Sequence, residues 1–262
     1  MPLDLSVFSD ENARAYLGER FALAPLGSDA WRVVGAARTI ADHHSFSGTK
    51  TYPRPDHPDA RKRRPLEFLM VAILISLRTT LENEQRAMDA VLDEFETVDE
   101  LYGAEQDLLE RLVRPAGLAR ARATRIRAAL QHVSTTHRRD LSSLELLGVQ
   151  GAREALLAIP GFGPKSADCF LTIGLGLPSM VVDINVFRVA SALFGISVSL
   201  REFTKPVIVA RLKARLDVAI GDDALLCQIV HTLFLVYGKH EMINEHISSK
   251  CLMKTYCLSC LQ

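Results

Sequence analysis

The chain has 262 residues, of which 48% are hydrophobic and only 6% are aromatic, a balance that suits packed helices better than sandwiched strands. Its formal net charge is zero, which on its face argues against a nucleic-acid partner. Residues 1–4 lack the start of a signal peptide and no apolar run reaches the ~18–20 residues of a membrane span, so we expect a cytoplasmic protein that is not in a membrane.

Charge is distributed unevenly along the chain. Residues 82–110 contain eleven acidic residues and one basic residue, whereas residues 111–139 contain eight arginines and no acid. A second basic run, Arg61–Arg64, precedes the first strongly apolar segment. The arginines could form a face that binds phosphates, or a solvated face that pairs with the acidic segment, and the sequence leaves both readings open.

Apolar residues recur with helical spacing along most of the chain. Helices are predicted from Ser9 and over 29–43, followed by a loop over 45–65 that holds four prolines. Residues 66–75 are apolar nearly all round, as a central buried helix would be. No segment shows convincing strand alternation, so the predicted fold class is all-α. The remaining predicted helices lie near 83–95, 97–102, 105–113, 120–136, 151–158, 204–219 and 222–237.

The segment 159–167 predicts a tight hairpin between two helices. Gly161 and Gly163 permit positive φ and close approach of a partner, and Pro164 suits the first position of the next helix. Amides exposed at that helix N-terminus can hold a phosphate oxygen without reading base sequence. The alternative is a plain helical hairpin that binds nothing.

Lys165 and Asp183 are the candidate reactive groups. Lys165 lies in the first turn of the helix after the hairpin, where the helix dipole disfavours a cation, and partial burial would make its amine a usable nucleophile. The lysine could instead contact a phosphate. Asp183 stands between apolar residues, so it either caps the helix that begins near Asn185 or takes part in chemistry, and the two roles are compatible.

The sequence also contains five cysteines, an odd number, of which three lie in the last twelve residues. This pattern indicates metal binding or free thiols rather than a disulfide framework.

The hairpin 159–167, followed by 182–189, resembles the endonuclease III branch of the helix-hairpin-helix DNA glycosylases. The similarity extends from about Pro65 to Gly238. It implies an all-helical protein that binds DNA across a cleft between two domains. One would be a six-helix barrel over 64–177 with the helix-hairpin-helix motif at about 151–174. The other would combine 1–63 with 178–262 and end in a metal-cluster loop over 251–260.

The resemblance implies a base-excision repair glycosylase with AP-lyase activity. Such an enzyme would remove damaged bases, generally oxidised pyrimidines in this branch, after the damaged nucleotide has flipped out of the duplex. Lys165 would attack C1′ and form a Schiff base, and Asp183 would assist deprotonation and stabilise positive charge on the sugar. The implied partner is double-stranded DNA with damaged bases or abasic sites, bound by a monomer associated with the nucleoid. Two alternatives stay open: a monofunctional glycosylase for alkylated or mismatched bases in which Asp183 activates water, and a non-catalytic DNA-binding protein.

The residues expected to contact DNA follow from the same resemblance. Arg78 stands where the family commonly has a glutamine that fills the gap left by the flipped base, and Leu118 matches a second wedge. Asn185 replaces a histidine that is usual in the aspartate motif, so the preferred lesion does not follow from the resemblance. The complete expected set is Gly161, Phe162, Gly163, Ser166, Arg78, Leu118, Arg120 and Arg122.

The family's [4Fe–4S] pattern has four cysteines spaced six, two and five residues apart, the first of them at the position of Met242. What remains here is Cys251, Cys257 and Cys260, without a fourth ligand in the local pattern. The sequence is compatible with a [4Fe–4S] cluster whose fourth ligand is unknown, with zinc held by the three cysteines and His246, or with no metal.

Overall fold

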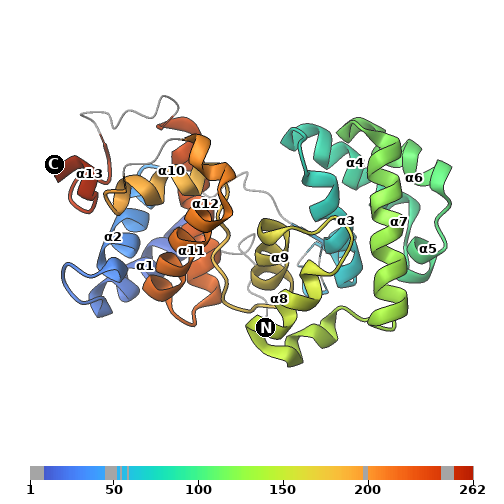
Figure 1. The fold of residues 1–262 in the computed structure, drawn as a ribbon, viewed down its shortest axis with the longest axis horizontal. Coiled ribbons are helices and arrows are strands. Elements are labelled where there is room, and N and C mark those ends of the chain that lie inside the picture. Colours follow the sequence, from blue (N-terminus) through green and yellow to red (C-terminus); the bar gives the residue numbers. More distant parts are fainter. Residues whose placement is uncertain are drawn as a thin grey trace. The chain divides into compact units, whose positions relative to one another are not determined.

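The computed structural model describes residues 9–44, 52–53, 55–57, 59–196, 200–242 and 251–261. All regular elements in these ranges are helical, so the predicted all-α fold is confirmed. The described residues form two compact units, unit 1 from 52–177 and unit 2 from 9–44 with 178–261 (Figure 1). None of the described helices is long and apolar enough to cross a lipid bilayer.

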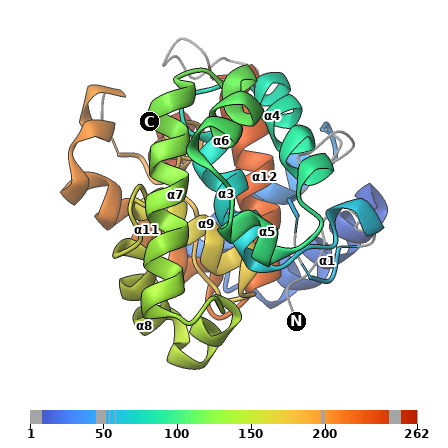
Figure 2. The ribbon, with the colours of Figure 1, turned by 90° about the vertical axis from the view of Figure 1, so that its right-hand side faces the viewer.

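Unit 1 is organised around helix α3 (Leu66–Ser76), in which every residue from Leu66 to Ile75 is buried. Helices α4 (Leu81–Glu94) and α7 (Ala119–Thr136) pack against α3, and α6 (Gln106–Val113) packs against α4 and α7 (Figure 2). A helix that is apolar all round can be stable only where neighbours cover each of its faces. The short elements of this half are η1 (Ala60–Lys62), α5 (Val98–Tyr102), η2 (Arg114–Ala116) and η3 (Ser142–Leu147).

The predicted hairpin lies between α8 (Gly148–Leu157) and α9 (Pro164–Cys169). The second helix continues from α9 into a single π-helical turn, η4 (Phe170–Gly174), which packs on α3. Helix α8 begins three residues before the predicted start at 151, because Gly148 turns the chain at φ +65°.

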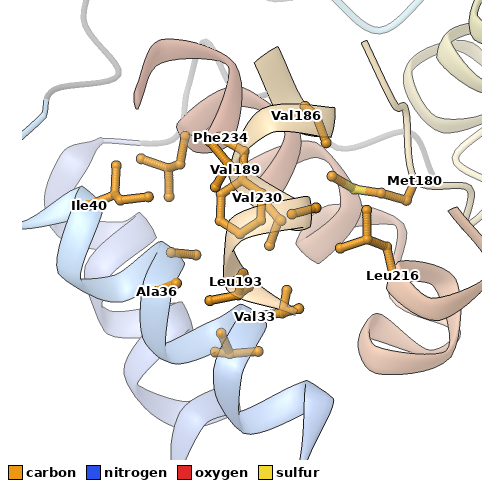
Figure 3. Packing of buried hydrophobic residues seen from close by; sticks show 14 of the residues in the cluster. Val33, Ala36, Ile40, Met180, Val186, Val189, Leu193, Leu216, Val230 and Phe234 are labelled. Carbon is orange, nitrogen blue, oxygen red and sulfur yellow. The ribbon is translucent and has the colours of Figure 1, made fainter. Parts of the chain in front are cut away.

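Unit 2 combines N-terminal helices α1 (Asp10–Leu23) and α2 (Asp29–Ala41) with the helices that follow the hairpin. Helix α2 packs against α1, α11 and α12, and α10 packs against α12. Figure 3 shows Val33, Ala36 and Ile40 of α2 in one apolar cluster with side chains of α10 and α12. The later elements are α10 (Ile184–Leu193), η5 (Leu200–Thr204), α11 (Pro206–Ile220), α12 (Ala224–His240) and α13 (Leu258–Leu261).

The basic run 61–64 belongs to unit 1, whereas the sequence placed residues 1–63 in the terminal domain. Arg61 pairs with Asp93 at 2.7 Å and lies 3.9 Å from Asp89, both on α4. Arg61 therefore pairs with the acidic helix α4. This agrees with the interpretation of the basic residues as a solvated face that pairs with the acidic segment.

Candidate active site

The hairpin leaves its second helix without a side-chain cap. Gly163 is the N-cap of α9 and Pro164 follows it, so amides of the first turn remain free of a capping side chain. Gly161 has φ +91° and uses the freedom that a glycine permits, whereas Gly163 has φ −114° and is extended. A Cβ on Gly163 would meet no heavy atom within 4 Å, so this glycine leaves the outer side of the hairpin open.

The side chains of Phe162 and Ser166 are buried, although both residues were expected to contact DNA. The Phe162 ring packs edge-on against Phe170 with 6.1 Å between ring centroids. Both side chains thus hold the hairpin to unit 1, and only the main chain at these positions is left to reach a ligand.

Lys165 lies in the first turn of α9 and its side chain is exposed. Within the ranges that the structure describes, its amine forms no hydrogen bond or ion pair, so it is free to meet a ligand. Because the side chain is exposed, unit 1 does not supply the partial burial on which the predicted activation of the amine depends.

Asp183 is buried and caps α10. Its Oδ1 accepts hydrogen bonds from the main-chain nitrogens of Asn185 and Val186, each at 2.9 Å, so the predicted capping role is confirmed. Among the described residues Oδ2 accepts no hydrogen bond, and it remains available to a ligand.

The segment 178–182, which leads into Asp183, is anchored to α11 and α12. The main-chain nitrogen of Met180 donates to Asp217 Oδ1 at 2.8 Å, and His231 Nδ1 lies 3.0 Å from the carbonyl oxygen of Val181. Lys213 holds Asp217 in place with a 2.8 Å ion pair. The Asp183 carboxylate is thus fixed from both sides, by its helix and by this segment.

Helix α12 approaches α10 very closely next to Asp183. A Cβ on Gly238 would lie 2.5 Å from the carbonyl oxygen of Asn185, so only glycine fits there. The Asn185 side chain accepts a hydrogen bond from Arg188 at 2.9 Å. The residue that replaces the family's usual histidine is thus held by its own helix.

The two expected wedge residues both occupy strained turns. Arg78, two residues after the end of α3, has φ 56°, and Leu118, directly before α7, has φ 49°. Left-handed backbone at a residue other than glycine costs on the order of 1–3 kcal/mol and persists where the surroundings enforce it. Both side chains are exposed, and Leu118 is 70% exposed although it is a large hydrophobic residue.

Arg122 does not face solvent, so the expectation that it contacts DNA is wrong. Only 3% of the residue is exposed, and its guanidinium donates to main-chain carbonyls within unit 1. The spacing of the buried residues of α7, Arg122, Ile126, Ala129 and Val133, places the arginine on the inner face. That helical spacing is the signal in the sequence that could have revealed its burial.

Arg120 and Arg125 are the exposed arginines nearest to the buried Arg122 along α7. Arg125 was not predicted as a site residue. Its stem covers the hairpin, because a Cβ on Gly161 would lie 2.2 Å from Arg125 Cδ. Since the side chain is exposed beyond that contact, Arg125 adds a cation next to the uncapped turn of α9.

The three C-terminal cysteines converge within unit 2. The sulfur atoms of Cys251, Cys257 and Cys260 all lie within 4.8 Å of one another. A hydrogen bond from Cys257 lowers the pKa of Cys251 to about 5, while the pKa of Cys257 is raised by that same bond and by burial. Three thiols at this spacing fit three of the four ligand positions of zinc or of a [4Fe–4S] cluster.

The loop of these cysteines is docked on α2 and α10. The Tyr256 ring covers Gly35, where a Cβ would lie 2.3 Å from a ring carbon, and Cys257 Sγ lies 3.2 Å from the carbonyl oxygen of Ala192. Met242, at the position of the family's first cysteine, is buried in the core of this unit. His246 lies outside the described residues.

The other two cysteines do not join the cluster. Cys169 and Cys227 are both buried, and burial raises the pKa of the Cys227 thiol to about 12. Within the described residues, the potential metal-binding group contains the three C-terminal cysteines and no further ligand.

Comparison with known proteins agrees with this geometry. Residues 71–207, about half of the chain, match the family described as "HhH-GPD superfamily base excision DNA repair protein". The chain therefore belongs to this superfamily of DNA glycosylases.

Individual relatives are distant. The putative DNA glycosylase At3g47830 of Arabidopsis thaliana is 34% identical over 47% of this chain and 43% of its own length, so the match spans less than half of that protein. Endonuclease III of Rickettsia felis is 24% identical over 72% of this chain and 81% of its own. A solved structure of a trapped endonuclease III–DNA covalent intermediate has a TM-score of 0.62 at 18% identity, covering 88% of this chain and 94% of that one, and it shows the likeness of fold.

Proposed function

We propose that the chain is a bifunctional DNA glycosylase that removes an oxidised pyrimidine and then cleaves the DNA strand through Lys165. The observation that carries this proposal is the exposed, unpaired amine of Lys165 in the uncapped first turn after the hairpin. A lysine amine is a nucleophile that can form a Schiff base, whereas a hairpin that only holds phosphate needs no lysine at this position.

The reaction begins when Lys165 Nζ attacks C1′ and forms the N–C1′ bond while the glycosidic bond breaks. The base leaves with the bonding electrons and takes up a proton. Loss of a proton from the amine and opening of the sugar give the Schiff base. Removal of a C2′ proton then breaks the C3′–O bond, and water finally hydrolyses the imine and frees the lysine.

Asp183 supports this sequence through its free oxygen Oδ2. Its negative charge stabilises the positive charge that develops on the sugar, and Oδ2 is the acceptor for the proton that the attacking amine loses. Because Oδ1 is occupied by the two main-chain donors of α10, the carboxylate keeps one orientation throughout the reaction.

Double-stranded DNA with damaged bases or abasic sites is the proposed partner, bound by a monomer. The open main chain at Gly163 and the uncapped turn of α9 would hold a phosphate, and the exposed Arg120 and Arg125 would add cations around it. Arg78 and Leu118 would enter the duplex when the damaged nucleotide is flipped out. We also propose that the barrel over 64–177 and the terminal segments are separate domains.

A monofunctional glycosylase for alkylated or mismatched bases is the second candidate. It is favoured by the Asp183 carboxylate, which is fixed through Oδ1 and whose Oδ2 accepts no hydrogen bond among the described residues. In that case the fixed Asp183 carboxylate would activate a water molecule, and the strand would stay intact after the base is released.

The three-cysteine group would hold a metal in either case. Cys251, Cys257 and Cys260 would supply three ligands to a [4Fe–4S] cluster or to zinc, and the bound group would cross-link the C-terminal loop. An iron–sulfur cluster would give the purified protein a brown colour with absorbance in the visible blue, whereas zinc would leave it colourless and detectable by elemental analysis.

Product analysis on a duplex with one oxidised pyrimidine tests the proposal. The bifunctional enzyme releases the base and cleaves the strand without added alkali, and the monofunctional enzyme leaves an abasic site that is cleaved only by alkali. Binding without either product would overturn both enzymatic proposals. Lys205→Ala is the control for Lys165→Ala, because Lys205 is an exposed lysine next to α11 whose ion pair among the described residues is with Glu202 of η5.

A further inference from the structure

Arg122 places its charged group inside unit 1 without a carboxylate partner among the described residues. A buried cation is costly unless its hydrogen-bond donors are satisfied. Here all five N–H donors of the guanidinium meet main-chain carbonyls. Nη1 donates to Leu74 and Ile75 at 2.8 Å each, Nη2 to Leu77 and Ala116 at 3.0 Å each, and Nε to Gly117 at 3.2 Å.

The five carbonyls come from two separate turns of the chain. Two belong to the last turn of α3, and the third belongs to its C-cap residue Leu77, which directly precedes Arg78. The other two belong to the turn before α7, where Gly117 directly precedes Leu118. One guanidinium thus joins the two turns in which Arg78 and Leu118 adopt positive φ.

We propose that Arg122 is a positioning residue that locks the turns of Arg78 and Leu118 to each other, so that both exposed side chains enter the DNA duplex as one rigid wedge. The inference rests on the proposed function, in which these two side chains fill the space of the flipped nucleotide. Arg122 itself touches neither the DNA nor the reacting atoms.

The planar guanidinium is suited to this role in a way that lysine is not. It presents five donors in a fixed fork, whereas a lysine ammonium has three donors on a flexible stem. Arg122→Lys keeps the charge but leaves at least two carbonyls without a donor, which loosens the link between the turns. Arg122→Met leaves all five without a donor and is the harsher variant.

Hydrogen exchange of the protein without DNA tests the lock itself. We expect Arg122→Lys to speed exchange of the amides at both turns, residues 77–79 and 117–119, and to leave the hairpin 160–166 unchanged. Arg127→Lys is the matched control, because Arg127 is an exposed arginine on the same helix. Exchange that is unchanged at either turn would overturn the proposal.

A double-mutant cycle on base excision from duplex DNA tests the effect on the wedge. Arg122→Lys should lower the single-turnover rate roughly tenfold in the wild-type background, since small misplacements of positioning groups cost this much or more. It should have little further effect in Leu118→Ala protein, whose wedge is already incomplete. The same loss in both backgrounds would show a merely structural role and overturn the inference.

The two failures can be told apart. If the wild-type protein excises no base from any duplex, the proposed function fails while the exchange measurement still decides whether Arg122 locks the turns. If excision occurs but Arg122→Lys shows no loss in the wild-type background, the proposed function stands and the positioning role is wrong.

Discussion

Asp183 Oδ1 accepts a hydrogen bond from the main-chain nitrogen of Val186 at 2.9 Å, so the carboxylate proposed to act on the sugar also starts helix α10. The two roles use different properties of the group. The cap needs an oxygen acceptor, which asparagine also has, whereas the chemistry needs a negative charge.

Asp183→Asn and Asp183→Ala should separate these roles. Asparagine is as good an N-cap as aspartate, so we expect little loss of stability, whereas alanine should cost about 1 kcal/mol. Both variants should lose base excision by at least about 100-fold. Urea unfolding and single-turnover rates check this, and an asparagine variant with near-normal excision would remove Asp183 from the chemistry.

The two hairpin glycines should respond differently to alanine. Gly163 has an ordinary φ and open space around its Cβ position, so Gly163→Ala should keep the melting temperature while weakening DNA binding, because a methyl group would stand where a phosphate approaches. Gly161→Ala should destabilise the fold by about 1–3 kcal/mol through its φ of +91° and its contact with Arg125. Fluorescence anisotropy and thermal melts measure the two effects, and unchanged DNA affinity in Gly163→Ala would count against the hairpin contact.

Gly238→Ala should destabilise unit 2. A methyl group 2.5 Å from the Asn185 carbonyl oxygen forces α10 and α12 apart, at a cost of about 1–3 kcal/mol, of which the better helix propensity of alanine returns up to about 1 kcal/mol. Gly18→Ala is the matched control, because that position within α1 has no heavy atom within 4 Å and should be stabilised. A stabilised Gly238→Ala protein in urea unfolding would contradict the close approach.

His137 should make the protein sensitive to mild acid. Burial and the nearby His132 lower the pKa of His137 from the ordinary value of 6.5, and its Nε2 is buried without a hydrogen-bond partner among the described residues. The unfolded chain therefore binds this proton more readily than the folded one, so stability should fall as the pH drops below about 6.5. Burial raises the pKa of Glu67, also in unit 1, which acts in the opposite direction at lower pH.

The comparison of wild type with His137→Gln isolates the histidine. The melting temperature of the wild type should fall more between pH 7.5 and 5.5 than that of the variant, since glutamine does not titrate. Parallel curves for the two proteins would show that His137 does not contribute.

The sequence predicted most of the helices because hydrophobic spacing alone marks their buried faces. It also predicted the hairpin, since two glycines and a proline constrain the backbone locally. Arg122 was expected to contact DNA from the resemblance, although its spacing from the apolar residues of α7 places it on the inner face. The carbonyls that hold it lie up to 48 residues away, and no local pattern shows them. Arg125 was missed for the same reason, since its contact with Gly161 arises only when α7 and the hairpin pack together.

Borohydride trapping on a duplex with one abasic site tests the central proposal most directly. Reduction of the Schiff base should join the wild-type protein covalently to the DNA, and the product should be lost in Lys165→Ala but retained in Lys205→Ala. Base release by the wild type without any trapped product, or trapping that persists in Lys165→Ala, would contradict lyase chemistry through Lys165.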